Sequence, residues 1–194
     1  MALITRDSLL TLEAYAKARP DFRAKVMAHK RNRKLSIGQN VTLIFEDELT
    51  VRYQIQEMLR IEKTFEEAGI QDELDAYNPL VPTGREFKAT MMIEYPDPDE
   101  RRGALARLKG VERRTWVQVA GMSRVYAVAD EDLERENEEK TSSVHFLRFE
   151  LGDDMAVALK NGASLSAGID HDAYRIDVSP VPTAIRDSLV GDLT

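Results

Sequence analysis

Among the side chains able to do chemistry, His145 has the most informative setting. It belongs to a segment, Val144 to Leu151, in which apolar residues recur at every second position, so a strand here places His145 on one face with Leu147 and Phe149. That face would point into the interior, where an imidazole needs hydrogen-bond partners. Two interpretations stay open: a core histidine bonded to a backbone carbonyl or a carboxylate, and a catalytic or ligand-binding histidine.

Glu94 is the second candidate, because it ends the unusually apolar segment Ala89 to Ile93. A carboxylate that is half-buried at such a place needs a cation or a hydrogen-bond donor to compensate for its lost hydration. The structural alternative is a glutamate at the end of a strand, paired with an arginine such as Arg148.

The third candidate group lies on the longest helical pattern of the chain, from about Glu48 to Ala68. Here Gln54 to Glu57 could turn two amides and a carboxylate toward a cavity above a sheet, with Arg60 nearby. The alternative is a solvated helix face or a ladder of salt bridges, which is the more usual role of such residues.

Together these residues define a candidate pocket between the long helix and the sheet, composed of Glu57, Arg60, Glu94, His145 and Arg148. Within it, His145, Glu94 and Glu57 form a nitrogen and carboxylate set compatible with a divalent iron, manganese or zinc ion. Glu62 could replace Glu57 in this set. The chain has only three histidines and no ligand pair at a diagnostic spacing, so catalytic residues are not assigned.

Composition excludes several classes of site. The chain has no Cys, which rules out disulfides and clusters held by Cys, so an iron–sulfur centre would have to sit on a partner. A net charge of −7 argues against nucleic-acid binding as a general property, because such binding depends on clustered Lys and Arg. The chain also has no P-loop, dinucleotide-binding, nucleophile-elbow or H-E-x-x-H motif.

Two oppositely charged segments stand out, a basic one at residues 23–34 and an acidic one at Asp130 to Glu139. The simplest interpretation is a solvated surface for each, the acidic one as a helix or an excursion from the sheet. The alternative is that the basic segment docks on an acidic partner or on the acidic segment of a second copy, and we expect a homo-oligomer, most simply a homodimer.

The elements that must position these residues indicate an α+β fold, a mostly antiparallel sheet packed against the long helix. Strands are predicted near residues 41–45, 86–95, 115–120, 124–129, 144–151, 165–169 and 174–178. Short helices are predicted after Asp97, over Asp153 to Lys160 and at the C-terminus. Short connections between strands favour antiparallel pairing.

The N-terminal segment predicts a helical hairpin. Thr5 could cap a first helix that ends near Arg19, and Pro20 suits the first turn of a second helix. We expect one domain over residues 1–194, because no linker or repeat divides the chain. No secretory signal or bilayer-spanning run is evident, so we expect a cytoplasmic protein with no membrane partner.

Five stretches of sequence carry a resemblance to a known family: Tyr53 to Arg60, Glu73 to Leu80, Ala89 to Pro96, Glu134 to Thr141 and Val144 to Phe149. Together they resemble a bacterial family of uncharacterised proteins catalogued as domain of unknown function number thirty-five hundred and one, and the similarity covers nearly the whole chain. The resemblance brings no assigned activity or catalytic residue. It implies genes encoded near a rubrerythrin-like diiron protein and an iron–sulfur oxidoreductase.

Two functional hypotheses follow. The first, which depends on the resemblance, is a cytoplasmic accessory or binding protein with redox protein partners in a peroxide-stress or electron-transfer system. The second is a metal-dependent protein or enzyme with a His/Glu site between the long helix and the sheet. The sequence leaves open whether the chain is an enzyme.

Overall fold

The alternating segments form two antiparallel sheets in the computed structural model, which describes residues 3–132 and 134–194. The five-stranded sheet has the order β1-β2-β3-β7-β6. Its strands are β1 (Lys34–Ile37), β2 (Val41–Glu46), β3 (Glu86–Ile93), β7 (Val144–Glu150) and β6 (Val128–Ala129). The strands predicted near residues 41–45, 86–95 and 144–151 are thereby confirmed.

The four-stranded sheet has the order β5-β4-β8-β9. Its strands are β5 (Arg124–Tyr126), β4 (Thr115–Val119), β8 (Leu165–His171) and β9 (Tyr174–Val178). After β5 the chain continues through Ala127 into β6, so one stretch runs from one sheet into the other. Antiparallel pairing is confirmed, but the expectation of a single sheet is corrected to two.

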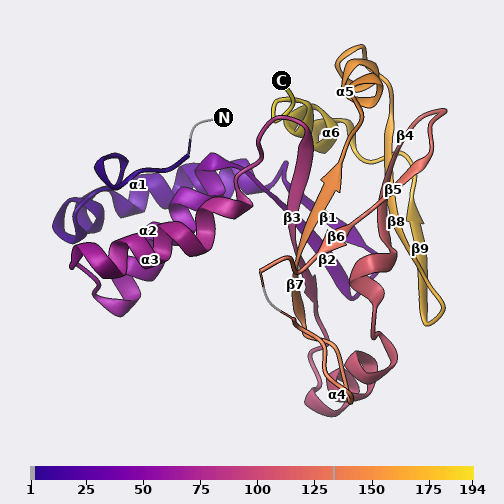
Figure 1. Ribbon diagram of the computed structural model, residues 1–194, viewed down its shortest axis with the longest axis horizontal. Helices are drawn as coiled ribbons and strands as arrows, with labels where there is room; N and C mark the ends of the chain where they lie inside the picture. The colour runs from indigo at the N-terminus through magenta and orange to yellow at the C-terminus, as the bar shows by residue number, and fades with distance from the viewer. Residues whose placement is uncertain (1–2, 133) are drawn as a thin grey trace.

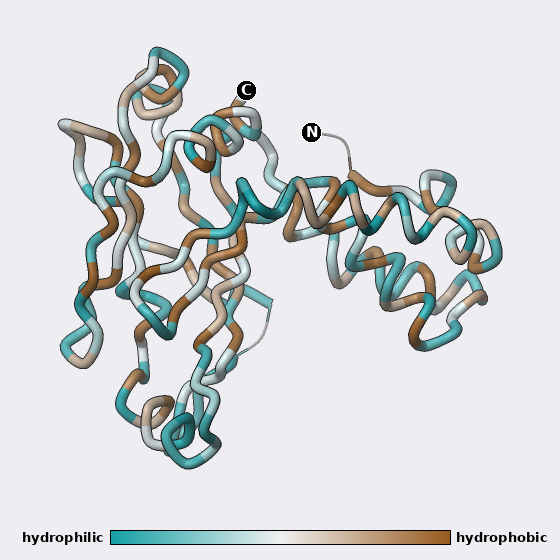
Figure 2. The backbone as a smooth tube through the Cα atoms, turned by 180° about the vertical axis from the view of Figure 1, so that it is seen from behind, coloured by the Kyte–Doolittle hydropathy of each residue, from teal (hydrophilic) through white to brown (hydrophobic). Residues whose placement is uncertain are grey.

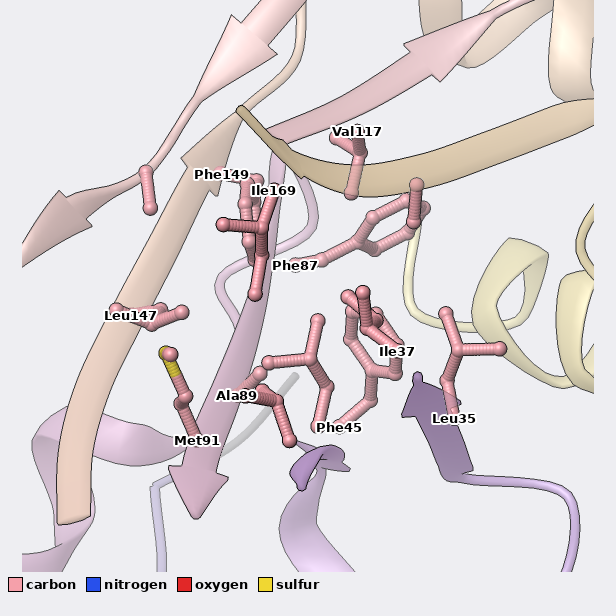
Figure 3. Packing of buried hydrophobic residues seen from close by; sticks show 14 of the residues in the cluster. Leu35, Ile37, Phe45, Phe87, Ala89, Met91, Val117, Leu147, Phe149 and Ile169 are labelled. Carbon is pink, nitrogen blue, oxygen red and sulfur yellow. The ribbon is translucent and has the colours of Figure 1, made fainter. Parts of the chain in front are cut away.

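The two sheets face each other across the main hydrophobic core, and together they form a sandwich (Figure 3). Phe87 and Phe149 from the five-stranded sheet point toward Val117 and Ile169 from the four-stranded sheet. The rings of Phe45 and Phe87 meet edge to face, with centres 6.1 Å apart. The side chains at alternate strand positions therefore build this core, as period-two patterning requires.

Short helices close the ends of the sandwich: α4 (Pro98–Arg107), the 3-10 turn η3 (Val111–Arg114), α5 (Asp153–Lys160) and α6 (Thr183–Val190). The predicted start of α4 is confirmed, because the Asp97 carboxylate accepts hydrogen bonds from the backbone N–H groups of Asp99 and Glu100. Figure 2 shows the end of the molecule around α4 as largely hydrophilic.

Three helices project from one side of the sandwich and form what we call the helical unit (Figure 1). They are α1 (Leu12–Lys30), α2 (Glu48–Glu62) and α3 (Glu67–Tyr77), accompanied by the 3-10 turns η1 (Arg6–Ser8) and η2 (Asn78–Leu80). Their own apolar cluster comprises Ile4, Leu9, Val51, Ile55, Leu59, Ile70, Leu74 and Val81. Within the described ranges, no helix has both the length and the apolar character needed to cross a bilayer.

The predicted long helix over Glu48 to Ala68 is wrong in length and in packing. The chain leaves the helix at Lys63, whose φ of 56° is left-handed, and α3 then begins at Glu67. This reversal lets α3 pack back on α2. Gly69, the residue after the predicted end of the long helix, lies inside α3. The helix that was expected to cover the sheet therefore packs mainly within the helical unit.

The predicted N-terminal hairpin is also wrong, because α1 is one helix that passes through Pro20. A proline inside a helix loses a backbone hydrogen bond and clashes with the preceding turn. Contacts with α2 on both sides of Pro20 offset this cost. Tyr15 reaches α2 through its hydroxyl, and the Phe22 ring lies 6.1 Å from that of Tyr53.

Candidate functional site

His145 lies on β7 with its ring fully buried, so the predicted inward orientation is confirmed. Its Nδ1 lies 2.6 Å from the Asp130 carboxylate, which accepts the Nδ1–H hydrogen bond. Its Nε2 lies 3.0 Å from the Thr141 hydroxyl and 3.1 Å from the Ser142 carbonyl oxygen. Both ring nitrogens therefore already have protein partners.

The order of carboxylate, imidazole and hydroxyl matches that of a catalytic triad. Here, however, His145 is 0% exposed and Thr141 is 1% exposed, so the hydroxyl that would act as the nucleophile faces no solvent. The arrangement instead secures the acidic segment to β7. Asp130, with a left-handed φ of 53°, also accepts a hydrogen bond from the backbone N–H of Phe146.

The acidic segment runs as an excursion between β6 and β7, and its described residues, all but Leu133, contain no helix. A single antiparallel bridge joins Glu136 to Thr141 across it. The guanidinium group of Arg135 lies 4.5 Å from the centre of the Phe146 ring and pairs with Asp130. Of the two predicted forms of this segment, the excursion is correct.

Glu57 and Arg60 lie in the helical unit. The Glu57 carboxylate accepts hydrogen bonds from the Tyr15 hydroxyl at 2.7 Å and from Arg19 Nε and Nη2 at 2.7 and 2.8 Å. Arg60 Nε lies 3.5 Å from the same carboxylate. The hydrogen bonds from Arg19 lower the pKa of Glu57 to about 2. Glu57 thus joins α1 to α2.

Glu94 accepts a hydrogen bond from the Thr42 hydroxyl at 2.9 Å and lines a wide, open hollow at the end of the sheet. Arg148 pairs instead with Glu131, at 2.8 and 2.9 Å, and with Glu150. Strand register explains why the expected pair of Glu94 with Arg148 does not form. Arg148 is opposite Lys88, toward the other end of β3.

The structure does not bring His145, Glu94 and Glu57 together, because each has its own hydrogen-bond partners on a different part of the fold. In the part of the chain that the structure describes, no group of three or more His, Asp or Glu side chains is placed to hold a metal ion. The five sequence candidates therefore do not form one pocket.

A cleft does lie between the helical unit and the outer face of the five-stranded sheet, where two cavities adjoin. One of about 330 Å³ lies between α2 and strands β2, β3 and β7. The other, of about 320 Å³, lies between the end of α3 and the acidic segment. Leu80 and Phe146 line both cavities and form the boundary between them. Arg148, one of the sequence candidates, lines the second.

Apolar side chains dominate the lining of the 330 Å³ cavity, which we call the inner cavity. They include Ile44, Val51, Met92, Val144 and Phe146. The polar lining is small: Glu46 from β2, Thr50 and Gln54 from α2, and Thr90 from β3, with Lys30 and Tyr77 at the margin. An apolar surface with a few convergent polar groups is typical of ligand-binding sites.

Glu46 is the polar group that the sequence interpretation missed. It is 9% exposed, and its carboxylate accepts hydrogen bonds from the hydroxyls of Thr50 and Thr90 at 2.5 and 2.6 Å. The available signal was strand alternation, which puts Glu46 on the same face as Ile44. Gln54, expected to face a cavity above the sheet, does line the inner cavity.

Residues 3–193 match the model of a family described as "Protein of unknown function (DUF3501)". The chain belongs to this family. The resemblance seen in the sequence is thereby confirmed, and DUF3501 membership covers both the sandwich and the helical unit.

A crystal structure of a novel protein of unknown function from Burkholderia pseudomallei K96243 is similar to this DUF3501 chain. The two sequences are 58% identical, each chain is covered over 100% of its length, and the TM-score is 0.95. A search of curated protein sequences finds no match. The comparisons therefore show the family and the fold of this chain.

Proposed function

We propose that this DUF3501 protein is a binding protein that holds a small, largely apolar molecule in the cleft between the helical unit and the five-stranded sheet. The observation that carries the proposal is the pair of adjoining cavities that share Leu80 and Phe146. Volumes of about 320 and 330 Å³ fall at the lower end of the range for small-molecule sites. Both cavities are concave, and apolar groups dominate the inner one.

The chemistry of the lining supports binding over catalysis. The hydroxyls of Thr50 and Thr90 both donate to Glu46, so the carboxylate holds them as hydrogen-bond donors. The His145 imidazole, which could serve as a base, is turned into the sandwich rather than into the cleft. The cleft therefore provides a ligand with a concave, largely apolar surface and with a hydrogen-bond acceptor.

Filling the inner cavity tests this proposal. Val144 is half-buried and lines the inner cavity, so Val144→Trp places an indole where the ligand would lie. Wild-type protein is expected to bind the neutral apolar dye Nile red, measured by fluorescence titration, and Val144→Trp is expected to weaken binding at least about tenfold.

The matched control is Val157→Trp, because Val157 is 57% exposed on α5 and lines neither cavity. It should bind the dye as the wild type does. Equal affinity of Val144→Trp and wild-type protein would disprove the cleft as the binding site, as would a wild type that binds no dye.

We further propose that this binding protein is a cytoplasmic accessory of a peroxide-stress or electron-transfer system, with rubrerythrin-like and iron–sulfur partners. Support comes from the genomic neighbourhood that the family resemblance implies. Because the chain has no Cys, any redox centre held by Cys would belong to the partners. Gentle copurification of the tagged protein from its native host should recover such a redox protein, and recovery of none would remove the main support.

A further inference from the structure

Glu46 is a nearly buried carboxylate whose direct partners, among the described residues, are hydroxyl groups. It ends β2 on the outer face of the sheet, and its two oxygens accept hydrogen bonds from Thr50 of α2 and Thr90 of β3. The O···O distances of 2.5 and 2.6 Å are typical of hydroxyls bonded to an ionised carboxylate. Each carboxylate oxygen has two lone pairs, so each can accept one more hydrogen bond.

Two cationic residues that adjoin Glu46 through the backbone or the strand register bind other groups. Arg33 donates to the backbone carbonyl of Glu46, but its guanidinium group pairs with Asp192 at 2.6 Å. Lys88 lies opposite Glu46 in the strand register, yet its ammonium donates to the Pro79 carbonyl at 2.6 Å. Neither side chain neutralises the Glu46 carboxylate by direct contact.

Lys30 also lines the inner cavity, but its ammonium lies over the Tyr53 ring, 5.7 Å from the ring centre. Among the residues that the structure describes, none brings a cation within ion-pair distance of Glu46. A carboxylate removed from water without a cation is costly, and the cost falls when a cation binds beside it.

We infer that the inner cavity takes a small aliphatic amine, whose ammonium group donates to Glu46 while its hydrocarbon part contacts Ile44, Val51 and Met92. This inference rests on the proposed function, because it names the chemical class of the ligand for the same cleft. The two threonine hydroxyls hold the carboxylate in place, so the ligand meets an acceptor that is already oriented.

Isothermal titration of the wild-type protein with n-hexylamine, n-hexanol and sodium hexanoate at pH 7 tests the inference, because the three probes share one chain and differ in charge. The amine is expected to bind at least about tenfold more tightly than the alcohol, the gain typical of a hydrogen bond to a charged group, and hexanoate most weakly. Glu46→Gln, which keeps the shape and removes the charge, should abolish this preference.

Glu94→Gln is the matched control, since Glu94 also accepts from a threonine hydroxyl but lies outside the cleft. Should Glu46→Gln fail to fold, nitrogen-15 spectra of the wild type provide a second measurement. Hexylamine should then shift the amide signals of Thr50 and Thr90 more than hexanol does.

The possible outcomes separate this inference from the proposed function. Equal binding of amine and alcohol, or a preference retained in Glu46→Gln, overturns the inference and leaves the apolar cleft in place. If none of the three probes binds while Nile red binds normally, the inference is overturned and the proposed function is not. Failure of Nile red to bind the wild type overturns the proposed function itself.

Discussion

Glu57 joins two helices through several donors at once. Tyr15 and Arg19 reach it from α1, and Arg60 approaches it from its own helix. Its side chain is only 13% exposed, so these charge-assisted hydrogen bonds are shielded from solvent. At the residue scale, a carboxylate that resembled a catalytic group in the sequence is therefore a structural connection.

Replacing Glu57 with Gln should destabilise the protein at pH 7 by about 1–3 kcal/mol, because Arg19 loses its charged partner. The folded-state pKa of Glu57 is depressed to about 2 from an ordinary value of 4.5. Its contribution is therefore fully present above pH 4.5 and is lost as the pH falls toward 2. Urea unfolding at pH 7 and pH 3 should show a smaller difference between variant and wild type at pH 3.

Glu62→Gln, at the exposed end of the same helix, serves as the control and should change the free energy of unfolding by less than about 0.5 kcal/mol. A loss for Glu57→Gln that is the same at both pH values would contradict the assigned role.

Single residues could be predicted from the sequence only in part. Alternation was enough to turn His145 inward, because the face of a strand depends on neighbours along the chain. Its partner Asp130 could not be predicted. It lies 15 residues earlier in the chain, and its backbone has a left-handed conformation. The predicted pair of Glu94 with Arg148 was wrong because it depends on the register between two strands, which neither strand's own sequence determines.

At the scale of elements, the break between α2 and α3 shows where periodicity misleads. Val51, Ile55 and Leu59 are buried at helical spacing, and the apolar residue Phe65 extends this pattern in the sequence. Phe65 is in fact 71% exposed, because the chain turns at Lys63. Strands were predicted more successfully, because alternation and turn residues such as Gly121 mark them locally. Their division into two sheets could not be predicted, because it depends on pairing between distant segments.

The turn at Lys63 leads to a second prediction. A left-handed conformation is unfavourable for a residue with a Cβ atom and free of that cost for glycine, so Lys63→Gly should stabilise the protein by about 0.5–1 kcal/mol. Ala68→Gly, at an exposed helical position in α3, should instead destabilise it by about 1 kcal/mol. Urea unfolding of both variants checks the pair, and destabilisation by Lys63→Gly would refute the assignment.

At the scale of the whole molecule, a buried ion pair holds the C-terminus at the junction of the two parts. Arg33 is 1% exposed and lies in the turn between α1 and β1, directly before β1. It forms a two-pronged pair with Asp192, at 3.0 and 2.6 Å, and donates to the backbone carbonyls of Phe45 and Glu46 at the end of β2. No sequence pattern predicts this pair, because its members are 159 positions apart. The expectation of one domain over residues 1–194 stays a prediction.

Asp192→Ala should therefore destabilise the protein by about 3–5 kcal/mol, because it leaves a buried guanidinium without its main partner. Denaturant unfolding measures the loss. The control is Asp187→Ala, which removes an exposed carboxylate from α6 and should cost less than about 1 kcal/mol. If the double variant Arg33→Met with Asp192→Leu is as unstable as Asp192→Ala, the unpaired charge is not the cause.

The polar character of this junction has a mechanical consequence. Among the described residues, the apolar clusters of the sandwich and of the helical unit have no residue in common, and the groups between them include Arg33, Asp192, Glu46 and Thr50. Because hydrogen bonds rather than a shared apolar core join the two parts, we expect them to separate at a lower free energy than that needed to unfold either part. A molecule bound in the cleft contacts both the sandwich and the helical unit. Its binding should therefore stabilise their junction and slow backbone amide hydrogen exchange in both parts.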